Sequence, residues 1–217
     1  MSNYQLKVEK LTKIYGRRLI FKDITFCFNQ NGIWGIAGHN GSGKSTLVKI
    51  LAGIIGASKG SVTHLLGERN ITADKLHEHI GFVAPYLVLY DEFSAQENLM
   101  HVCKIREVPF NKEKIDYLLN EFLLYDRRND EVKGYSSGMK QRLKYVFALM
   151  HSPKVLILDE PTSNLDSSGK ETVYKIVQSE AASTIVIIAS NEESDLSLCQ
   201  DVIQLEKYKM IHSEEGL

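Results

Sequence analysis

Apolar positions along the chain predict both strands and helices. Short apolar or alternating stretches predict strands over residues 4–15, 24–28, 33–37, 61–66, 79–84, 154–158, 184–189 and 202–205. Apolar residues at helical spacing predict a helix over 44–51 and a helical region over 94–151. The clearest helix covers 137–150, where Leu143, Val146 and Met150 share one face. Strands that alternate with helices favour a mostly parallel sheet covered on both sides, in a strand order that chain order alone does not give.

Length and charge restrict the classes of protein that fit. A chain of 217 residues suits one domain, or one domain with an inserted lobe, and 43% apolar residues suffice for a packed core. The formal net charge of -1 provides no overall attraction to nucleic acid or to an anionic membrane. We therefore expect no nucleic-acid partner.

The sequence offers neither a membrane span nor a disulfide framework. Residues 1–10 contain no apolar signal core, and every apolar stretch is far shorter than the roughly 20 residues that a membrane helix needs. Cys27, Cys103 and Cys199 are far apart and have no metal-binding spacing. We expect them to be small buried residues in a reducing compartment.

A glycine-rich segment between a predicted strand and a predicted helix fits the Walker A pattern GxxxxGK[ST]. Its residues are Gly38, His39, Asn40, Gly41, Ser42, Gly43, Lys44 and Ser45. Glycines let backbone N–H groups turn toward phosphate oxygens, and the following helix offers its positive end. Lys44 is expected to reach the β- and γ-phosphates, and the Ser45 hydroxyl to ligate Mg²⁺. The loop from Gly38 to Thr46 is thus predicted to bind ATP with Mg²⁺.

Two carboxylates follow the buried strand near 154–158. Asp159 and Glu160 stand where open α/β sheets bind ligands, at the carboxyl end of a strand, as in a Walker B motif. Asp159 is suited to hold Mg²⁺ through water. Glu160 is suited to orient or deprotonate an attacking water. These two motifs alone suit many phosphate-loop NTPases.

A third motif narrows the family. The segment from Tyr135 to Arg142 resembles, in variant form, the LSGGQ signature of ATP-binding cassette (ABC) transporter ATPases. Ser136 and Gly138 match that signature, and Ser137 stands in place of its first glycine. Tyr15 is similar to the aromatic that stacks on adenine in this family, and residues 163–166 resemble its D-loop.

The resemblance implies a head-to-tail dimer. Each ATP would lie between Gly38–Thr46 of one subunit and Ser136, Ser137 and Gly138 of the other. Taken alone, Tyr15 also fits a packing aromatic, Ser136 and Ser137 fit a helix N-cap, and Asp166 fits a cap for a helix that starts near residue 167.

Two positions depart from the family pattern. Pro85 stands where family members carry a glutamine that faces Mg²⁺ and the attacking water, and Gln96 lies too far along to replace it. Asn191 occupies the position of the family's switch histidine, and we include it among the predicted catalytic residues with Lys44 and Glu160. Both departures bear on the rate of hydrolysis and its coupling, and neither touches the residues that bind ATP.

The resemblance implies one ABC ATPase domain over residues 1–217. Its α/β fold would combine a RecA-like P-loop core (1–85 and 152–217), an N-terminal antiparallel β region, and an inserted helical lobe (86–151). The chain would form a homodimer or pair with another ATPase subunit. It would sit in the cytoplasm, on the inner face of the membrane, and power a separate integral membrane subunit of exporter type. The alternatives are a catalytically weak regulatory module and a soluble ABC protein of DNA repair or translation, although the long coiled coils or zinc insertions typical of the latter are not seen.

Overall fold

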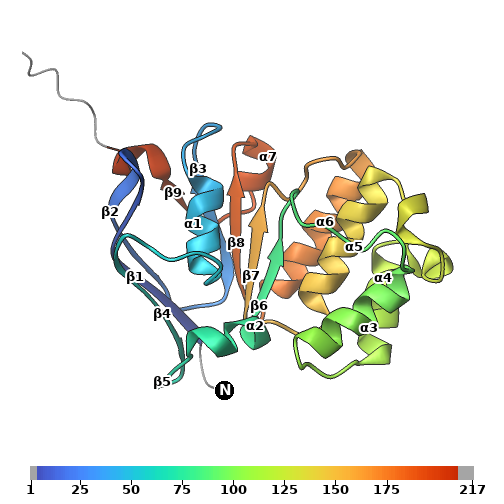
Figure 1. The fold of residues 1–217 in the computed structure, drawn as a ribbon. Helices are drawn as coiled ribbons and strands as arrows, with labels where there is room; N and C mark the ends of the chain where they lie inside the picture. The colour runs from blue at the N-terminus through green and yellow to red at the C-terminus, as the bar shows by residue number, and fades with distance from the viewer. Residues whose placement is uncertain (1–3, 210–217) are drawn as a thin grey trace, which may run out of the picture.

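The computed structural model describes residues 4–209, which form two sheets and a group of helices (Figure 1). The N-terminal sheet is antiparallel, with the strand order β2-β1-β4-β5. Its strands are β1 (Tyr4–Tyr15), β2 (Arg18–Phe28), β4 (Lys59–Leu66) and β5 (Arg69–Asn70). The predicted antiparallel region is confirmed, and only the short β5 was not predicted.

The second sheet is parallel, with the order β6-β7-β8-β3-β9. Its strands are β3 (Gly32–Ala37), β6 (Ile80–Val83), β7 (Val155–Asp159), β8 (Ile185–Ser190) and β9 (Asp201–Gln204). β3 leads into the predicted phosphate loop and β7 ends in the acidic pair, and these two strands flank β8. Parallel strands place their carboxyl ends at one edge, so the two motifs meet there.

The parallel sheet is covered on both faces, as predicted. Val155 and Ile157 of β7 pack with α1 (Lys44–Leu51) and the antiparallel sheet. Leu156 and Leu158 pack on the opposite face, against the helices. Alternate residues of a strand face opposite sides, so this fully buried strand contributes to two cores.

The helical region between β6 and β7 contains α3 (Ala95–Ile105), α4 (Lys112–Glu121) and α5 (Ser137–Leu149). With α6 (Ser167–Glu180) these helices gather beside the parallel sheet in Figure 1. Left-handed residues interrupt the region, at Glu107 (φ 53°) after α3 and at Leu123 (φ 55°) after α4. Two short helical turns, η2 (Tyr125–Arg127) and η3 (Val132–Gly134), lie within the predicted helical region. Outside it, the short helical turns that the periodicity did not predict are η1 (Ala73–Lys75), α2 (Leu76–His79), α7 (Glu193–Leu196) and η4 (Leu205–Tyr208).

The structure also bears on the expectations for membrane-spanning helices and for burial of the cysteines. Among residues 4–209, no helix is long and apolar enough to cross a membrane. The prediction that all three cysteines are buried is wrong: Cys103 is buried, Cys199 is half-buried, and Cys27 is exposed. Cys27 faces outward because its neighbour in β2, Phe28, points into the core.

Candidate functional site

A cleft of about 650 Å³ lies where the phosphate loop meets the ends of β7 and β8. Of the residues predicted from sequence, it is lined by Asn40, Gly41, Gly43, Lys44, Ser45, Thr46, Glu160 and Asn191. Pro85 and Ser163 also line it, as do Arg18 and Ile20 of β2, which the sequence did not indicate. The two main motifs and both departures from the family pattern therefore share one cleft.

The phosphate loop depends on glycine at two positions. Gly41 and Gly43 have φ angles of 77° and 109°, which side chains rarely permit. A Cβ at Gly43 would also lie 2.5 Å from the side chain of Ile20. Gly43 is the N-cap of α1, where none of the described side chains caps the first turn. The free N–H groups and positive end of α1 thus lie at the cleft and suit a phosphate.

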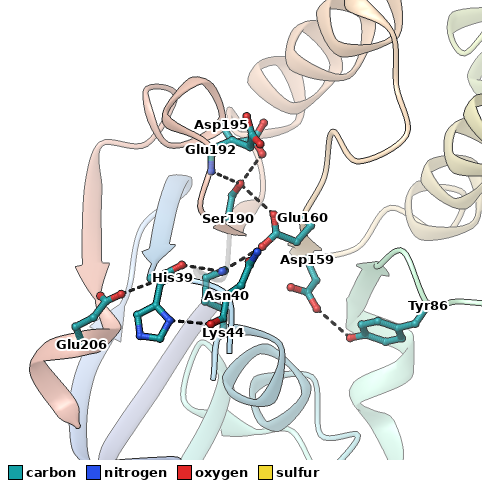
Figure 2. A network of polar contacts seen from close by, with 11 residues as sticks. His39, Asn40, Lys44, Tyr86, Asp159, Glu160, Ser190, Glu192, Asp195 and Glu206 are labelled. Atoms are coloured by element: carbon teal, nitrogen blue, oxygen red, sulfur yellow. Dashed lines mark hydrogen bonds and ion pairs between the residues drawn. The ribbon is translucent and has the colours of Figure 1, made fainter. Parts of the chain in front are cut away.

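Lys44 and Glu160 form an ion pair at the base of the cleft (Figure 2). Lys44 is only 5% exposed, and its Nζ lies 3.1 Å from Glu160 Oε1. The same Nζ donates a hydrogen bond of 2.8 Å to the carbonyl of Gly38. A phosphate oxygen that bound Lys44 would therefore have to share or replace these two contacts.

Glu160 adopts an unusual backbone conformation. Its φ of 48° is left-handed, although its N–H still donates to the carbonyl of Ala189 at 2.8 Å. Strained residues of this kind collect at functional sites. The turn begins directly after β7, and the Glu160 side chain extends from it to Lys44 and, at 3.5 Å, to the Ser190 hydroxyl.

Asp159 has the features of a metal ligand. It is 1% exposed, and its Oδ2 accepts a hydrogen bond of 3.1 Å from the Tyr86 hydroxyl. Its Oδ1 is buried and has no hydrogen-bond partner among residues 4–209. Burial raises the pKa of Asp159 above its usual value, while the hydroxyls of Ser45 and Tyr86 act in the opposite direction. A buried, unpaired carboxylate oxygen beside a hydroxyl suits Mg²⁺, which prefers oxygen ligands, so the residues present fit the predicted metal.

The turn after β8 carries Asn191, and hydrogen bonds to Asp195 hold it in place. The Ser190 hydroxyl donates to Asp195 Oδ2 at 2.7 Å. Asp195 is fully buried and also accepts from Thr162 at 3.0 Å and from Tyr174 at 2.7 Å. Sequence analysis missed Asp195, because no motif spacing joins it to Thr162 or Tyr174. Its position four residues after Asn191 was the only signal available.

The signature residues lie away from this cleft. Ser136 caps α5, where its hydroxyl accepts from the Met139 N–H at 3.2 Å, and Ser137 begins the helix. Gly138 faces the D-loop segment, because a Cβ there would lie 3.4 Å from the carbonyl of Asn164. Ser136, Ser137 and Gly138 are not among the residues that line the cleft in the described part of the chain. The structure does not bring them to the phosphate loop of their own chain.

Asp166 and Tyr15 carry the two remaining expectations, a helix cap and a stacking aromatic, and the structure confirms only the cap. Asp166 caps α6, because its side chain accepts from the Gly169 N–H at 2.8 Å. Tyr15 is 49% exposed at the end of β1, with the Lys13 ammonium 4.6 Å from its ring centroid. It pairs in the sheet with Arg18, which lines the cleft. A half-exposed aromatic ring is therefore the sheet neighbour of a residue that lines the cleft.

The phosphate loop is also held from the far end of the chain. Glu206 Oε1 accepts a hydrogen bond of 2.7 Å from the His39 N–H, across 167 residues of sequence (Figure 2). The His39 ring contacts the Asn40 carbonyl at 2.7 Å. His39 thus braces the loop, and it is not among the described residues that line the cleft. Ser42 is buried, and its N–H donates to the His39 carbonyl at 3.0 Å.

Comparison with known proteins gives a consistent result. The model of the family described as ABC transporter matches residues 21–163. The chain is 35% identical over 213 residues to the uncharacterised ABC transporter ATP-binding protein YhcH of Bacillus subtilis, covering 95% of this chain and 68% of that relative. It is 30% identical over 213 residues to the linearmycin resistance ATP-binding protein LnrL of the same organism, again covering 95% of this chain and 68% of the relative.

A solved structure agrees with these relatives. A Pyrococcus furiosus protein described as an ABC transporter ATP-binding protein superposes with a TM-score of 0.81 at 25% identity. The match covers 95% of this chain and 100% of the Pyrococcus furiosus chain.

Proposed function

Because the chain belongs to the ABC transporter family of ATP-binding proteins, we propose that it is the subunit that dimerises around MgATP and powers a separate membrane subunit. As a member of this family it is an ATP hydrolase. The observation that carries the proposal is that Lys44 of the phosphate loop and Glu160 pair in one cleft, with Asp159 directly before Glu160 at the end of β7.

The geometry supports a simple hydrolytic mechanism. The N–H groups of the phosphate loop and Lys44 bind the β- and γ-phosphates. Glu160 accepts a proton from a water as the water attacks the γ-phosphorus, and the bond to the β-phosphate oxygen breaks to give ADP and inorganic phosphate. Asp159 and Ser45 would hold Mg²⁺, which neutralises charge on the phosphates when bound. Tyr15 would stack on the adenine beside Arg18.

The proposed dimer accounts for the position of the signature residues. Ser136 and Gly138 lie outside the cleft of their own chain, at the exposed start of α5. That start offers free N–H groups, as the phosphate loop does. A second copy arranged head to tail would bring this helix end to the other side of the bound ATP.

An apolar groove supports the proposal that the chain docks on a membrane subunit. It has a volume of about 290 Å³ and lies between the loop after β6 and helices α3 and α5. Val88, Tyr90 and Ile54 line it and are 92%, 56% and 54% exposed. Clustered exposed apolar side chains mark interaction surfaces. We propose that the helical lobe, residues 86–151, meets the membrane subunit here and holds the chain at the cytoplasmic face of the membrane.

The name of one relative supports a proposal for the direction of transport. LnrL is named for linearmycin resistance. Removal of a toxic compound from the cell is one way to gain resistance, so we propose an exporter for this chain as well. The transported compound would contact the membrane subunit rather than this chain.

A catalytically weak regulatory module remains the second candidate, and Pro85 and Asn191 favour it. Steady-state phosphate release by the purified chain with MgATP separates the two. Rapid turnover that Lys44→Ala abolishes supports the transport-coupled ATPase, whereas ATP binding with only very slow turnover supports the regulatory module. Co-purification of an integral membrane protein from detergent extract tests the partner, and Val88→Asp should abolish it while ATP binding stays intact. Co-purification unchanged in Val88→Asp would contradict the groove as the docking surface.

A further inference from the structure

The loop that follows β6 places a tyrosine next to the predicted metal ligand. Pro85 lines the cleft, and the next residue, Tyr86, donates its hydroxyl to Asp159 Oδ2 at 3.1 Å (Figure 2). Tyr86 and Asp159 are 73 residues apart in sequence, and no motif links them. The contact occupies one oxygen of a carboxylate whose other oxygen, Oδ1, is buried and unpaired within the part of the chain that the structure describes.

Tyr86 is held in this position by two lysines. Lys144 of α5 donates from its Nζ to the carbonyls of Ala84 at 3.2 Å and Pro85 at 2.7 Å. Lys49 of α1 lies with its Nζ 4.0 Å from the centroid of the Tyr86 ring. The backbone before Tyr86 and the face of its ring are thus both anchored, so the hydroxyl has a defined direction.

We propose that Tyr86 is a positioning residue that orients Asp159 so that Oδ1, together with Ser45, faces the divalent cation of the bound nucleotide. The inference rests on the proposed function. A carboxylate can rotate about its last side-chain bond, and a hydrogen bond that fixes one oxygen also fixes the direction of the other. Tyr86 thereby supplies, one residue later, a polar contact to the metal side of the cleft that Pro85 is unable to make.

Tyr86→Phe tests this directly, because it removes the hydroxyl and keeps the ring over Lys49. The Kd of ATP is measured by calorimetry with excess Mg²⁺ and again with EDTA, and the ratio of the two values gives the gain from Mg²⁺. We expect this gain to fall about fivefold or more in the variant, as for loss of a hydrogen bond to a charged group. The Kd in EDTA should stay within about twofold of the parent value, because Tyr86 acts only through the metal side.

A second measurement is independent of nucleotide affinity. At saturating ATP, free Mn²⁺ is followed by electron paramagnetic resonance, and Tyr86→Phe should bind Mn²⁺ more weakly than the parent. Tyr117→Phe, an exposed tyrosine on α4, is the matched control and should equal the parent in both assays.

Three results would overturn the inference. One is an unchanged Mg²⁺ gain and Mn²⁺ affinity in Tyr86→Phe. Another is an equal loss of ATP affinity with Mg²⁺ and with EDTA, which would make Tyr86 a nucleotide contact or a structural residue. A parent chain that binds no ATP would end the proposed function and this inference with it, whereas normal MgATP binding with an unaffected Tyr86→Phe would end the inference alone.

Discussion

Glu160→Gln separates two roles of one side chain. Gln has nearly the same size and keeps its hydrogen-bonding capacity, but it carries no negative charge and is a poor base. In the structure Glu160 is both the candidate base and the partner of Lys44, at 3.1 Å. The substitution should therefore slow hydrolysis and, at the same time, free Lys44 for phosphate.

The magnitudes follow from the geometry. Removal of a positioned general base costs about 10²–10⁴-fold in turnover. Lys44 is 5% exposed and Glu160 27% exposed, so their contact is partly screened by solvent. At the lower end of the range for hydrogen bonds to charged groups, about 1.5 kcal/mol, its loss should tighten ATP binding by roughly tenfold. Tighter binding without turnover should also let an ATP-bound dimer accumulate.

Three assays follow these effects. Steady-state phosphate release reports turnover, titration with a fluorescent ATP analogue reports affinity, and size-exclusion chromatography with MgATP reports the dimer. Glu171→Gln, an exposed carboxylate on α6, is the matched control and should resemble the parent in all three.

The two proposed roles of Glu160 can be refuted independently. Hydrolysis by Glu160→Gln at the parent rate would refute the role as base. An ATP affinity that stays equal to the parent's or falls would refute the argument that Glu160 competes with phosphate for Lys44.

Three further perturbations test other parts of the site and the core. Asn191→His should raise kcat by roughly one to two orders of magnitude with little change in ATP affinity, because imidazole adds a charge-assisted contact in the transition state; phosphate release measures it. Asp195→Asn should lower the free energy of unfolding in urea by about 1–3 kcal/mol, because three hydroxyls donate to this buried carboxylate. Burial lowers the pKa of His64 and of His151 from 6.5 to about 4. At a pH between 4 and 6.5 the unfolded chain protonates these two histidines and the folded chain does not. The free energy of unfolding, measured in urea, should therefore fall by roughly 2 kcal/mol per histidine from pH 7 to 5.

Each of these has a clear contrary result. A His variant no faster than the parent would show that Asn191 does not limit turnover. Unchanged stability of Asp195→Asn would mean that the three hydroxyls find other partners at no cost. His64→Gln should remove about half of the loss of stability on acidification, and an unchanged loss would exclude His64 as a source.

Much of the site was predictable because its motifs are local. The phosphate loop is a contiguous segment between a strand and a helix, and Asp159 and Glu160 directly follow a buried strand. The rule that strands of a parallel sheet end at one edge was sufficient to bring the two motifs together. The apolar pattern likewise predicted most of the strands and a parallel sheet, whereas the antiparallel region was expected from the family resemblance. Neither gave the order of the strands.

The contacts that hold these motifs in place were not predictable from the sequence. Tyr86 reaches Asp159 across 73 residues, and Glu206 reaches His39 across 167. Such pairs depend on the strand order and on the direction of side chains, which no local pattern encodes. The prediction for Cys27 was wrong for a related reason. Cysteine is a residue type that is usually buried, but the pleat of β2 turns this side chain outward.

The segment from Gly38 to Thr46 is proposed to be the phosphate site of an ATPase. The most direct test is the affinity of MgATP for the parent and for Lys44→Ala, measured by titration with a fluorescent ATP analogue. Loss of a charged hydrogen bond to phosphate should weaken binding by roughly tenfold or more, while Lys175→Ala, an exposed lysine on α6, should bind as the parent does. An unchanged affinity in Lys44→Ala would contradict the claim.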